Sequence, residues 1–273
     1  MMLKAAPVLA LVSVGALLGA PQLGRADADR PANSDENAGE NSTAELAPTP
    51  AIGRAADRLA PTADEPDEGY GFDNPQSTRY FFAPNALGLE SGTGYYQNAW
   101  IFFNNVNYGV TDNFSIGAGT IPMFLSGVPE ASPAWILPKV SVSASDRVHF
   151  ALGGMFGGML AGNDSIGAGL AYGLVTIGDR DNNATLGAGY GYAAGSVGRT
   201  PTFNMSGMAR ASDRLFLVTE NYYFPWADSG LISAGIRLAS EGAAVDLGAV
   251  SFTQRGELSP ALPWLGVSIP FGG

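Results

Sequence analysis

The chain has 273 residues and a net charge of −11, and it contains no cysteine. Without a thiol there is no disulfide framework, no thiolate metal ligand, no cysteine nucleophile and no cysteine for a lipid anchor. The acidic balance argues against nucleic acid as a partner.

The first residues form a targeting signal. Lys4 places a positive charge ahead of the apolar stretch 5–20, and Ala26, Asp27 and Ala28 offer a small-x-small cleavage site. The apolar stretch is short for a membrane-spanning helix, which needs about 20 residues. We predict a signal peptide over 1–28 and export from the cytoplasm.

Acidic residues are concentrated directly after this signal. Asp29 to Asp73 contain eleven acidic residues against three arginines, in a stretch rich in Pro, Ala, Asn and Glu. Such a composition buries too little apolar surface to offset the entropy of the chain. We predict that 29–77 is a disordered, acidic segment in the periplasm.

Short polar turns recur along the rest of the chain, roughly every 30 to 35 residues, which is the length of two membrane strands with their connections. They lie near 112, 146, 181, 213 and 241, and longer connections rich in Gly, Pro, Asn and Ser separate them. Short turns at one end and longer loops at the other are typical of an up-and-down barrel in an outer membrane.

Apolar and small residues alternate between the turns. The pattern is clear in 114–119, 136–144, 186–192 and 231–239, and a period of two indicates strands. A soluble β-sandwich would fill its second face with Lys, Glu and Thr, whereas here that face carries Gly, Ser, Asn and Ala. This favours a barrel whose apolar face meets lipid, and a soluble β-sandwich is the alternative.

The predicted fold class is therefore all-β: a single-chain, antiparallel, up-and-down transmembrane β-barrel over 78–273, with about twelve strands. The strands are expected at 79–86, 94–108, 114–122, 135–144, 147–158, 165–177, 184–194, 202–211, 214–223, 230–239, 243–254 and 262–271. Ten strands remain open if the first and last do not pair. Pro138 conflicts with its strand because it cannot donate a ladder hydrogen bond, so we expect either a bulge there or a place on the outer rim.

If both ends of a twelve-stranded barrel lie in the periplasm, all the acidic turns fall on the periplasmic side. The connections near 87–93, 123–134, 159–164, 195–201, 224–229 and 255–261 then face outward. In this arrangement Arg79 and Tyr80 begin the first strand near the periplasm, and Tyr95 and Tyr96 lie near the outer rim.

Three segments at the start of the barrel resemble a group of uncharacterised bacterial outer-membrane β-barrel proteins. These are Thr-Arg-Tyr-Phe-Phe-Ala-Pro from 78 to 84, Gly-Tyr-Tyr-Gln-Asn from 94 to 98 and Asn-Tyr-Gly-Val-Thr-Asp-Asn-Phe-Ser-Ile-Gly from 107 to 117. The resemblance covers about 40 residues and implies an exported barrel. It implies no substrate, reaction or site residue.

Catalytic and cofactor chemistry has few candidates. His149 is the single histidine, and a serine hydrolase would need it beside a nucleophilic Ser and an orienting Asn or Asp. One His and no Cys leave no transition-metal cluster. Paired glycines such as Gly117 and Gly119 lack the strand–loop–helix context of a nucleotide loop. We expect them to thin one wall of the barrel and leave room for side chains from the opposite wall or for water.

Charges predicted within strands should point into the lumen, because a charge in lipid costs about 2–4 kcal/mol. The candidate lumen charges are Lys139, Arg210, Glu220, Arg237 and Asp246. One interpretation pairs Arg210 with Glu220 and Arg237 with Asp246 to hold the interior together. The other makes the set a constriction that selects solutes by charge.

The expected function is that of a non-enzymatic outer-membrane protein, either a narrow passive pore for small solutes or a structural barrel. The alternatives are an outer-membrane lipid hydrolase or lipid-modifying enzyme, and a surface interaction barrel acting through its outward loops. No inserted loop or plug domain is evident in the sequence. Expected partners are outer-membrane lipids, the barrel-assembly machinery and a small-solute permeant, with no cofactor, metal or nucleic acid.

Overall fold

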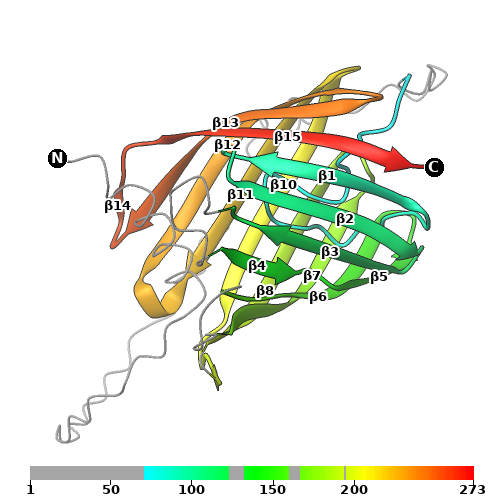
Figure 1. Cartoon of the computed structure of the whole chain (residues 1–273). Helices are drawn as coiled ribbons and strands as arrows, with labels where there is room; N and C mark the ends of the chain where they lie inside the picture. The colour runs from blue at the N-terminus through cyan, green and yellow to red at the C-terminus, as the bar shows by residue number, and fades with distance from the viewer. Residues whose placement is uncertain (1–70, 123–131, 160–166, 194) are drawn as a thin grey trace, which may run out of the picture. The chain divides into compact units, whose positions relative to one another are not determined.

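The structure is a computed structural model that describes residues 71–122, 132–159, 167–193 and 195–273 (Figure 1). The predicted signal peptide and residues 29–70 of the predicted acidic segment lie outside the described residues. Within the described ranges no helix has the length and apolar character needed to cross a membrane.

The described strands close into a single antiparallel barrel (Figure 1). They are β1 (Thr93–Ala99), β2 (Phe103–Thr111), β3 (Phe114–Thr120), β4 (Pro133–Ile136), β5 (Lys139–Ser145), β6 (Val148–Met159), β7 (Ala168–Gly178), β8 (Asn183–Ala193), β10 (Thr202–Ser212), β11 (Leu215–Phe224), β12 (Ser229–Ser240), β13 (Ala243–Gln254) and β15 (Leu262–Gly272). β4 and β5 act as one strand, because both pair with β3 on one side and β6 on the other. β1 pairs with β15 and β8 with β10, so these strands form a closed wall of twelve.

Three short elements lie in the connections. β9 (Ser196–Val197) extends the hairpin after β8, and β14 (Glu257–Leu258) extends the hairpin after β13. A single 3-10 turn, η3 (Pro225–Ala227), links β11 to β12. The predicted fold class, an all-β barrel of twelve strands, is confirmed.

The first part of the wall differs from the prediction. Residues 79–86 form no strand, and their one bridge joins Arg79 to Pro84 within the segment itself. The predicted strand 94–108 is instead the hairpin of β1 and β2, which turns at Trp100 and Ile101 with φ of 48° and 69°. Asn and Gly usually occupy such a left-handed pair, so the sequence carries no turn signal here. The two errors cancel in the strand count.

The connections divide between the two ends of the barrel. All five predicted acidic turns lie at one end, where β1 begins and β15 stops; we call it the turn end. The strands β1, β3, β6, β8, β11 and β13 end at the opposite end of the barrel, which we call the loop end.

Two placements at the beginning of the barrel are corrected by this arrangement. The segment 87–93 lies at the turn end, where the Ser91 amide donates to Asp112 Oδ1 at 3.0 Å. Tyr95 and Tyr96 lie in the first half of β1, which begins at the turn end, so they are on the side of the acidic turns and not at the end opposite them, where they were expected. Both errors follow from the missing strand at 79–86.

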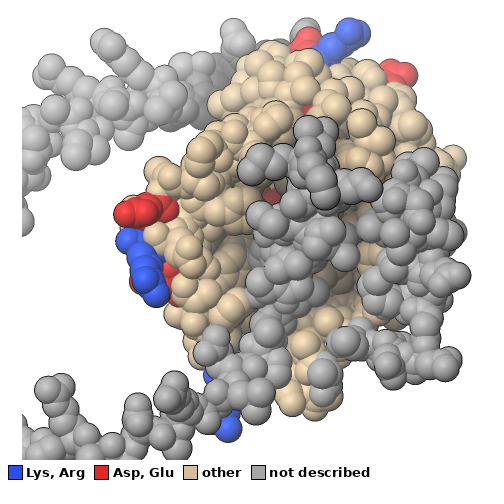
Figure 2. Space-filling model, turned by 60° about the vertical axis from the view of Figure 1, so that its left-hand side comes forward, with Lys and Arg blue, Asp and Glu red and all other residues tan. Residues whose placement is uncertain are grey.

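The two faces of the wall have opposite chemistry. On β12, Ile232 and Leu238 are 49% and 44% exposed, whereas Arg237 between them is 0% exposed. β5 repeats the pattern, with exposed Val140 and Val142 and buried Lys139. Figure 2 shows few charged side chains on the described surface that faces the viewer. An apolar outer surface suits a hydrocarbon environment, and the interior holds the buried charges beside an apolar cluster that includes Phe216. One sheet closed on itself excludes the sandwich.

Pro138 causes neither a bulge nor a displacement to the rim. Ile136 pairs with Phe156 and Lys139 with Gly153, which keeps one register on both sides of the proline. The Gly154 amide donates to the Pro138 carbonyl at 3.0 Å. Proline cannot donate a bond in return, so the wall tolerates one missing ladder hydrogen bond.

Candidate functional site

Residues 71–92, which we call the inner loop, do not join the wall; the two ends of the loop are exposed and its middle is buried inside the barrel. The loop folds back on itself, because the Tyr80 amide donates to the Ala83 carbonyl at 2.9 Å and the Asn85 amide to the Thr78 carbonyl at 3.0 Å. Tyr80, Phe81 and Ala83 are almost completely buried. The predicted absence of an inserted loop is therefore wrong, and 71–77, predicted as part of the disordered segment, belong to this loop.

The inner loop enters and leaves the lumen at the turn end. Near its start, the Phe72 carbonyl accepts a hydrogen bond from Arg210, which also donates to the carbonyl of Asp213 in a turn. Near its end, Arg180 donates to Gly88 and pairs with Glu90 at 3.3 Å. The middle of the loop reaches deeper, where the Phe81 ring lies 5.4 Å from that of Trp264, near the loop end of β15.

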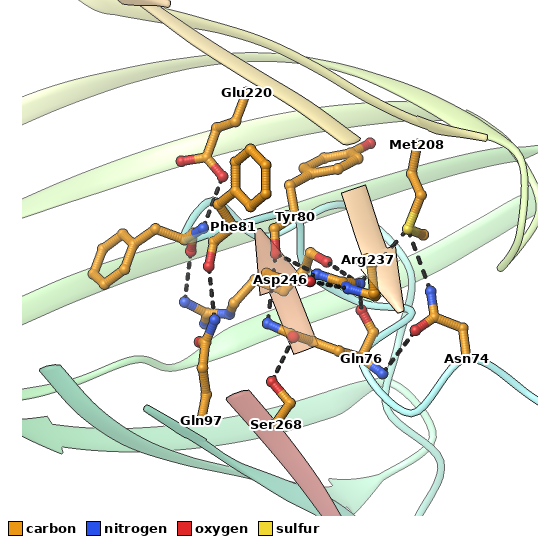
Figure 3. Close-up of polar contacts among 12 residues, drawn as sticks. Asn74, Gln76, Tyr80, Phe81, Gln97, Met208, Glu220, Arg237, Asp246 and Ser268 are labelled. Carbon is orange, nitrogen blue, oxygen red and sulfur yellow. Dashed lines mark hydrogen bonds and ion pairs between the residues drawn. The ribbon is translucent and has the colours of Figure 1, made fainter. Parts of the chain in front are cut away.

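Arg237 and Asp246 form the centre of a polar cluster around the loop (Figure 3). Arg237 Nε lies 2.7 Å from Asp246 Oδ1, and Nη2 lies 3.1 Å from Oδ2. The guanidinium also donates to the carbonyls of Gln76 at 2.9 Å, Arg79 at 3.2 Å and Tyr80 at 2.7 Å. This pairing, which the sequence suggested, therefore also binds the backbone of the inner loop.

Glu220 lies on β11, next to β12, and holds the tip of the loop (Figure 3). Its Oε2 accepts the amides of Phe82 at 2.8 Å and Ala83 at 2.9 Å, and its Oε1 accepts the Tyr222 hydroxyl at 2.9 Å. Hydrogen bonds from two amides and a hydroxyl satisfy a buried carboxylate without a cation.

Lys139 holds the returning half of the loop. Its ammonium donates to the carbonyls of Asn85 at 3.0 Å and Leu87 at 2.6 Å. Lys139 is only 6% exposed, so the side chain is committed to the inner loop.

Arg210 pairs with Asp181 at 2.9 Å, in the turn between β7 and β8, and not with Glu220 as the sequence suggested. Its guanidinium also lies 4.9 Å from the ring centre of Phe216. Burial raises the pKa of the Asp181 carboxyl, although the bond from Arg210 acts in the opposite direction. All five candidate lumen charges are buried, and each belongs to a group that contacts the inner loop.

Neutral residues complete the contacts and are absent from the predicted set. Gln97 donates to the Phe81 carbonyl at 2.6 Å, and the Tyr80 hydroxyl lies 2.6 Å from Asn183 Oδ1 and 2.7 Å from Thr185 Oγ1. Burial also raises the pKa of the Tyr80 phenol. One feature of the sequence could have identified these residues: each carries an amide or a hydroxyl at an inward position of a strand whose other residues are apolar or small.

The glycines of β3 make room for inward side chains. A Cβ on Gly119 would lie 2.2 Å from Asn105 Oδ1 and 2.4 Å from Trp135 Nε1, and one on Gly117 would lie 2.5 Å from Asn107 Oδ1. The space above each glycine is thus taken by a side chain of a neighbouring strand, and not by the opposite wall or by water as the sequence suggested.

His149 lies at the turn end, as predicted. Its Nδ1 is 2.8 Å from Ser143 Oγ on the neighbouring strand, and its Nε2 is 3.1 Å from the carbonyl oxygen of Gly178. A carbonyl takes the position that a carboxylate occupies in a triad. Among the described residues no group of His, Cys, Asp and Glu is arranged to hold a metal.

No protein-family model matches the chain, and a search of curated proteins gives no match. Ten chains of solved structures match. The chain is similar to the KdgM porin in complex with disordered oligogalacturonate, with 6% identity and a TM-score of 0.47 over 66% of this chain and 98% of that one. It is similar to the NanC porin, with 8% identity and a TM-score of 0.43 over 66% of this chain and 98% of that one. It is also similar to the CymD monoaromatic hydrocarbon channel, with 7% identity and a TM-score of 0.42 over 75% of this chain and 98% of that one. Matches at such low identity concern the barrel fold alone. Any statement about the function of this chain therefore has to rest on its own residues.

Proposed function

We propose that the chain is an outer-membrane barrel of the porin type, whose narrow pore for small solutes is closed at rest by the inner loop. The apolar outer face and the predicted signal peptide support this location. Short turns of bacterial outer-membrane barrels lie in the periplasm, so the turn end and the acidic segment 29–70 are assigned to that side.

One observation carries the proposal: the wall holds the inner loop through side chains and not through a strand ladder. Arg237, Glu220 and Lys139 all bond to backbone groups of the loop, whereas the wall closes through β1 and β15 without it. The loop can therefore leave through the turn end while every ladder hydrogen bond of the barrel stays intact.

The same contacts keep the loop in place at rest. Hydrogen bonds to charged groups contribute roughly 1.5–3 kcal/mol each, and the loop accepts or donates several of them. Withdrawal would uncover a lumen lined by both signs of charge, which gives no strong preference for cations or anions.

Planar-bilayer recordings test the proposal with two deletion variants. Removing 71–90 should give discrete conductance, whereas the full chain and a variant lacking only 29–70 should show little, because both retain the loop. Heat-modifiable migration on gels verifies that each barrel has folded. A folded 71–90 deletion without conductance would favour a structural barrel instead.

The Ser143–His149 contact favours one other function, a lipid hydrolase, since Nδ1 lies in hydrogen-bond distance of the hydroxyl. An esterase assay on the full chain and on Ser143→Ala and His149→Ala separates it from the pore. Activity lost in both variants, with conductance unchanged, would support the enzyme.

We further infer that the chain belongs to the outer-membrane barrel group suggested by its three motifs. What supports this is their proximity: Arg79 of the first motif donates to the Tyr95 hydroxyl of the second at 3.3 Å and to Asn107 Oδ1 of the third at 3.2 Å. The motifs thus describe one inner loop and the wall that receives it.

A further inference from the structure

A small cavity lies between the inner loop and the wall formed by β1, β2, β3, β5 and β7. Its volume is about 10 Å³, which is room for about one water-sized particle. Seven of its ten lining residues are less than one-tenth exposed. The Arg237–Asp246 pair is not part of the lining, and Arg79 connects the two, because its carbonyl accepts a bond from Arg237.

Two buried cations line this cavity, Arg79 from the loop and Lys139 from β5. They are 5% and 6% exposed. In the part of the chain that the structure describes, neither has a carboxylate within 4.0 Å. Their bonds go to neutral oxygens: Arg79 to Tyr95, Phe82 and Asn107, and Lys139 to two carbonyls.

The lining presents further donors and no carboxylate. An ammonium has three N–H groups, and Lys139 uses two of them on the loop. Asn107 is 5% exposed, and its Nδ2 has no hydrogen-bond partner. Ser115 and Tyr172, whose side chains carry hydroxyls, are also lining residues. A hydrogen-bond donor that is buried without an acceptor destabilises the folded state. The donors named here surround a cavity with room for about one water-sized particle.

The charges inside the described barrel do not balance. Asp246 pairs with Arg237 and Asp181 with Arg210. Glu220 is the remaining buried carboxylate, and its oxygens bind loop amides and the Tyr222 hydroxyl. Counted at their formal charges, Arg79 and Lys139 against Glu220 leave one positive charge in surplus.

We propose that this cavity binds one small monovalent anion, of the halide class, between Arg79 and Lys139. The anion supplies the missing negative charge, accepts the free N–H groups of Lys139 and Asn107, and bridges the inner loop to the wall. Uncompensated buried charge is strongly destabilising, so the bound anion stabilises the closed barrel. The site does not depend on whether the pore conducts.

Heat unfolding of the full chain in detergent micelles tests the site. The protein is melted in sodium chloride and in sodium gluconate at equal ionic strength, because gluconate is too large for the cavity. We expect Tm to rise with chloride along a saturating curve and to stay constant in gluconate. Equal Tm values in the two salts at every concentration would overturn the proposal.

Two isosteric variants locate the effect. Asn107→Asp places a carboxylate in the cavity and should abolish the dependence of Tm on chloride while the barrel still folds. Asn105→Asp is the matched control: Asn105 is an inward residue of the same strand that accepts a bond from Trp135 and does not line the cavity. It should keep the chloride dependence. The same response in both variants would contradict the site.

Long-wavelength anomalous diffraction from crystals grown in chloride identifies the occupant, because chlorine scatters anomalously and water oxygen does not. The proposal expects one anomalous peak within hydrogen-bond distance of Lys139 Nζ. A well-ordered particle without anomalous signal would be a water and would overturn it.

Discussion

Arg237 and Asp246 stand directly opposite each other on β12 and β13 and meet in a two-point ion pair, with Arg237 completely buried. The pair joins neighbouring strands, and its cation also binds three carbonyls of the inner loop. It therefore contributes both to the wall and to the closure of the lumen.

Asp246→Asn should lower the free energy of unfolding by about 3–5 kcal/mol, because it leaves Arg237 charged in the interior without its partner. Urea unfolding followed by tryptophan fluorescence measures the change. Arg214→Met, at an exposed turn position, is the control and should stay within about 0.5 kcal/mol of the parent. Equal effects of the two substitutions would show that the buried pair has no special role.

Glu220→Gln should loosen the tip of the inner loop. Glutamine keeps one acceptor oxygen but loses the charge, and a hydrogen bond to a charged group contributes roughly 1.5–3 kcal/mol against about 1 for a neutral one. Brief openings in bilayer recordings should become about tenfold more frequent. Glu257→Gln, exposed in β14 at the loop end, should leave the recordings unchanged. An unchanged opening frequency in Glu220→Gln would argue against this carboxylate as an anchor.

Ile101→Gly should stabilise the barrel. Ile101 is 68% exposed and has φ of 69°, a left-handed conformation that costs a residue with a Cβ about 1–2 kcal/mol. Glycine adopts it freely, so the urea midpoint should rise. Val106→Gly, at an exposed position within β2, should instead lower it, because glycine costs about 0.5–1 kcal/mol in a regular strand. A lower midpoint for Ile101→Gly would mean that its side chain outweighs the strain.

The barrel wall could be predicted because period-two patterning is a property of each strand by itself. The alternation of Ile232, Arg237 and Leu238 shows which side faces lipid without reference to any other strand. The polar turns near 146 and 213 also carry their own signals. What failed was the hairpin at Trp100 and Ile101, where bulky residues adopt a conformation that sequence patterns assign to Asn and Gly.

The filled lumen could not be predicted, because it depends on contacts between distant parts of the chain. Tyr80, Phe81 and Phe82 are aromatic residues of the kind enriched in strands. Only their packing inside a closed wall shows that they belong to a loop and not to a strand. The inward charges were identifiable from the cost of placing them in lipid, but their partners were not. Glu220 binds loop amides and Arg210 binds Asp181, and neither contact follows from the position of a residue within its strand.

Hydrogen exchange of the full chain in lipid bilayers tests the closure of the lumen most directly. The amides of Phe82, Ala83, Asn85 and Ala86 all donate hydrogen bonds inside the barrel. Mass spectrometry should find the peptide that contains them protected for minutes to hours, like the strand amides of β12. Exchange of that peptide within seconds, while β12 stays protected, would show that the inner loop does not occupy the lumen in the membrane.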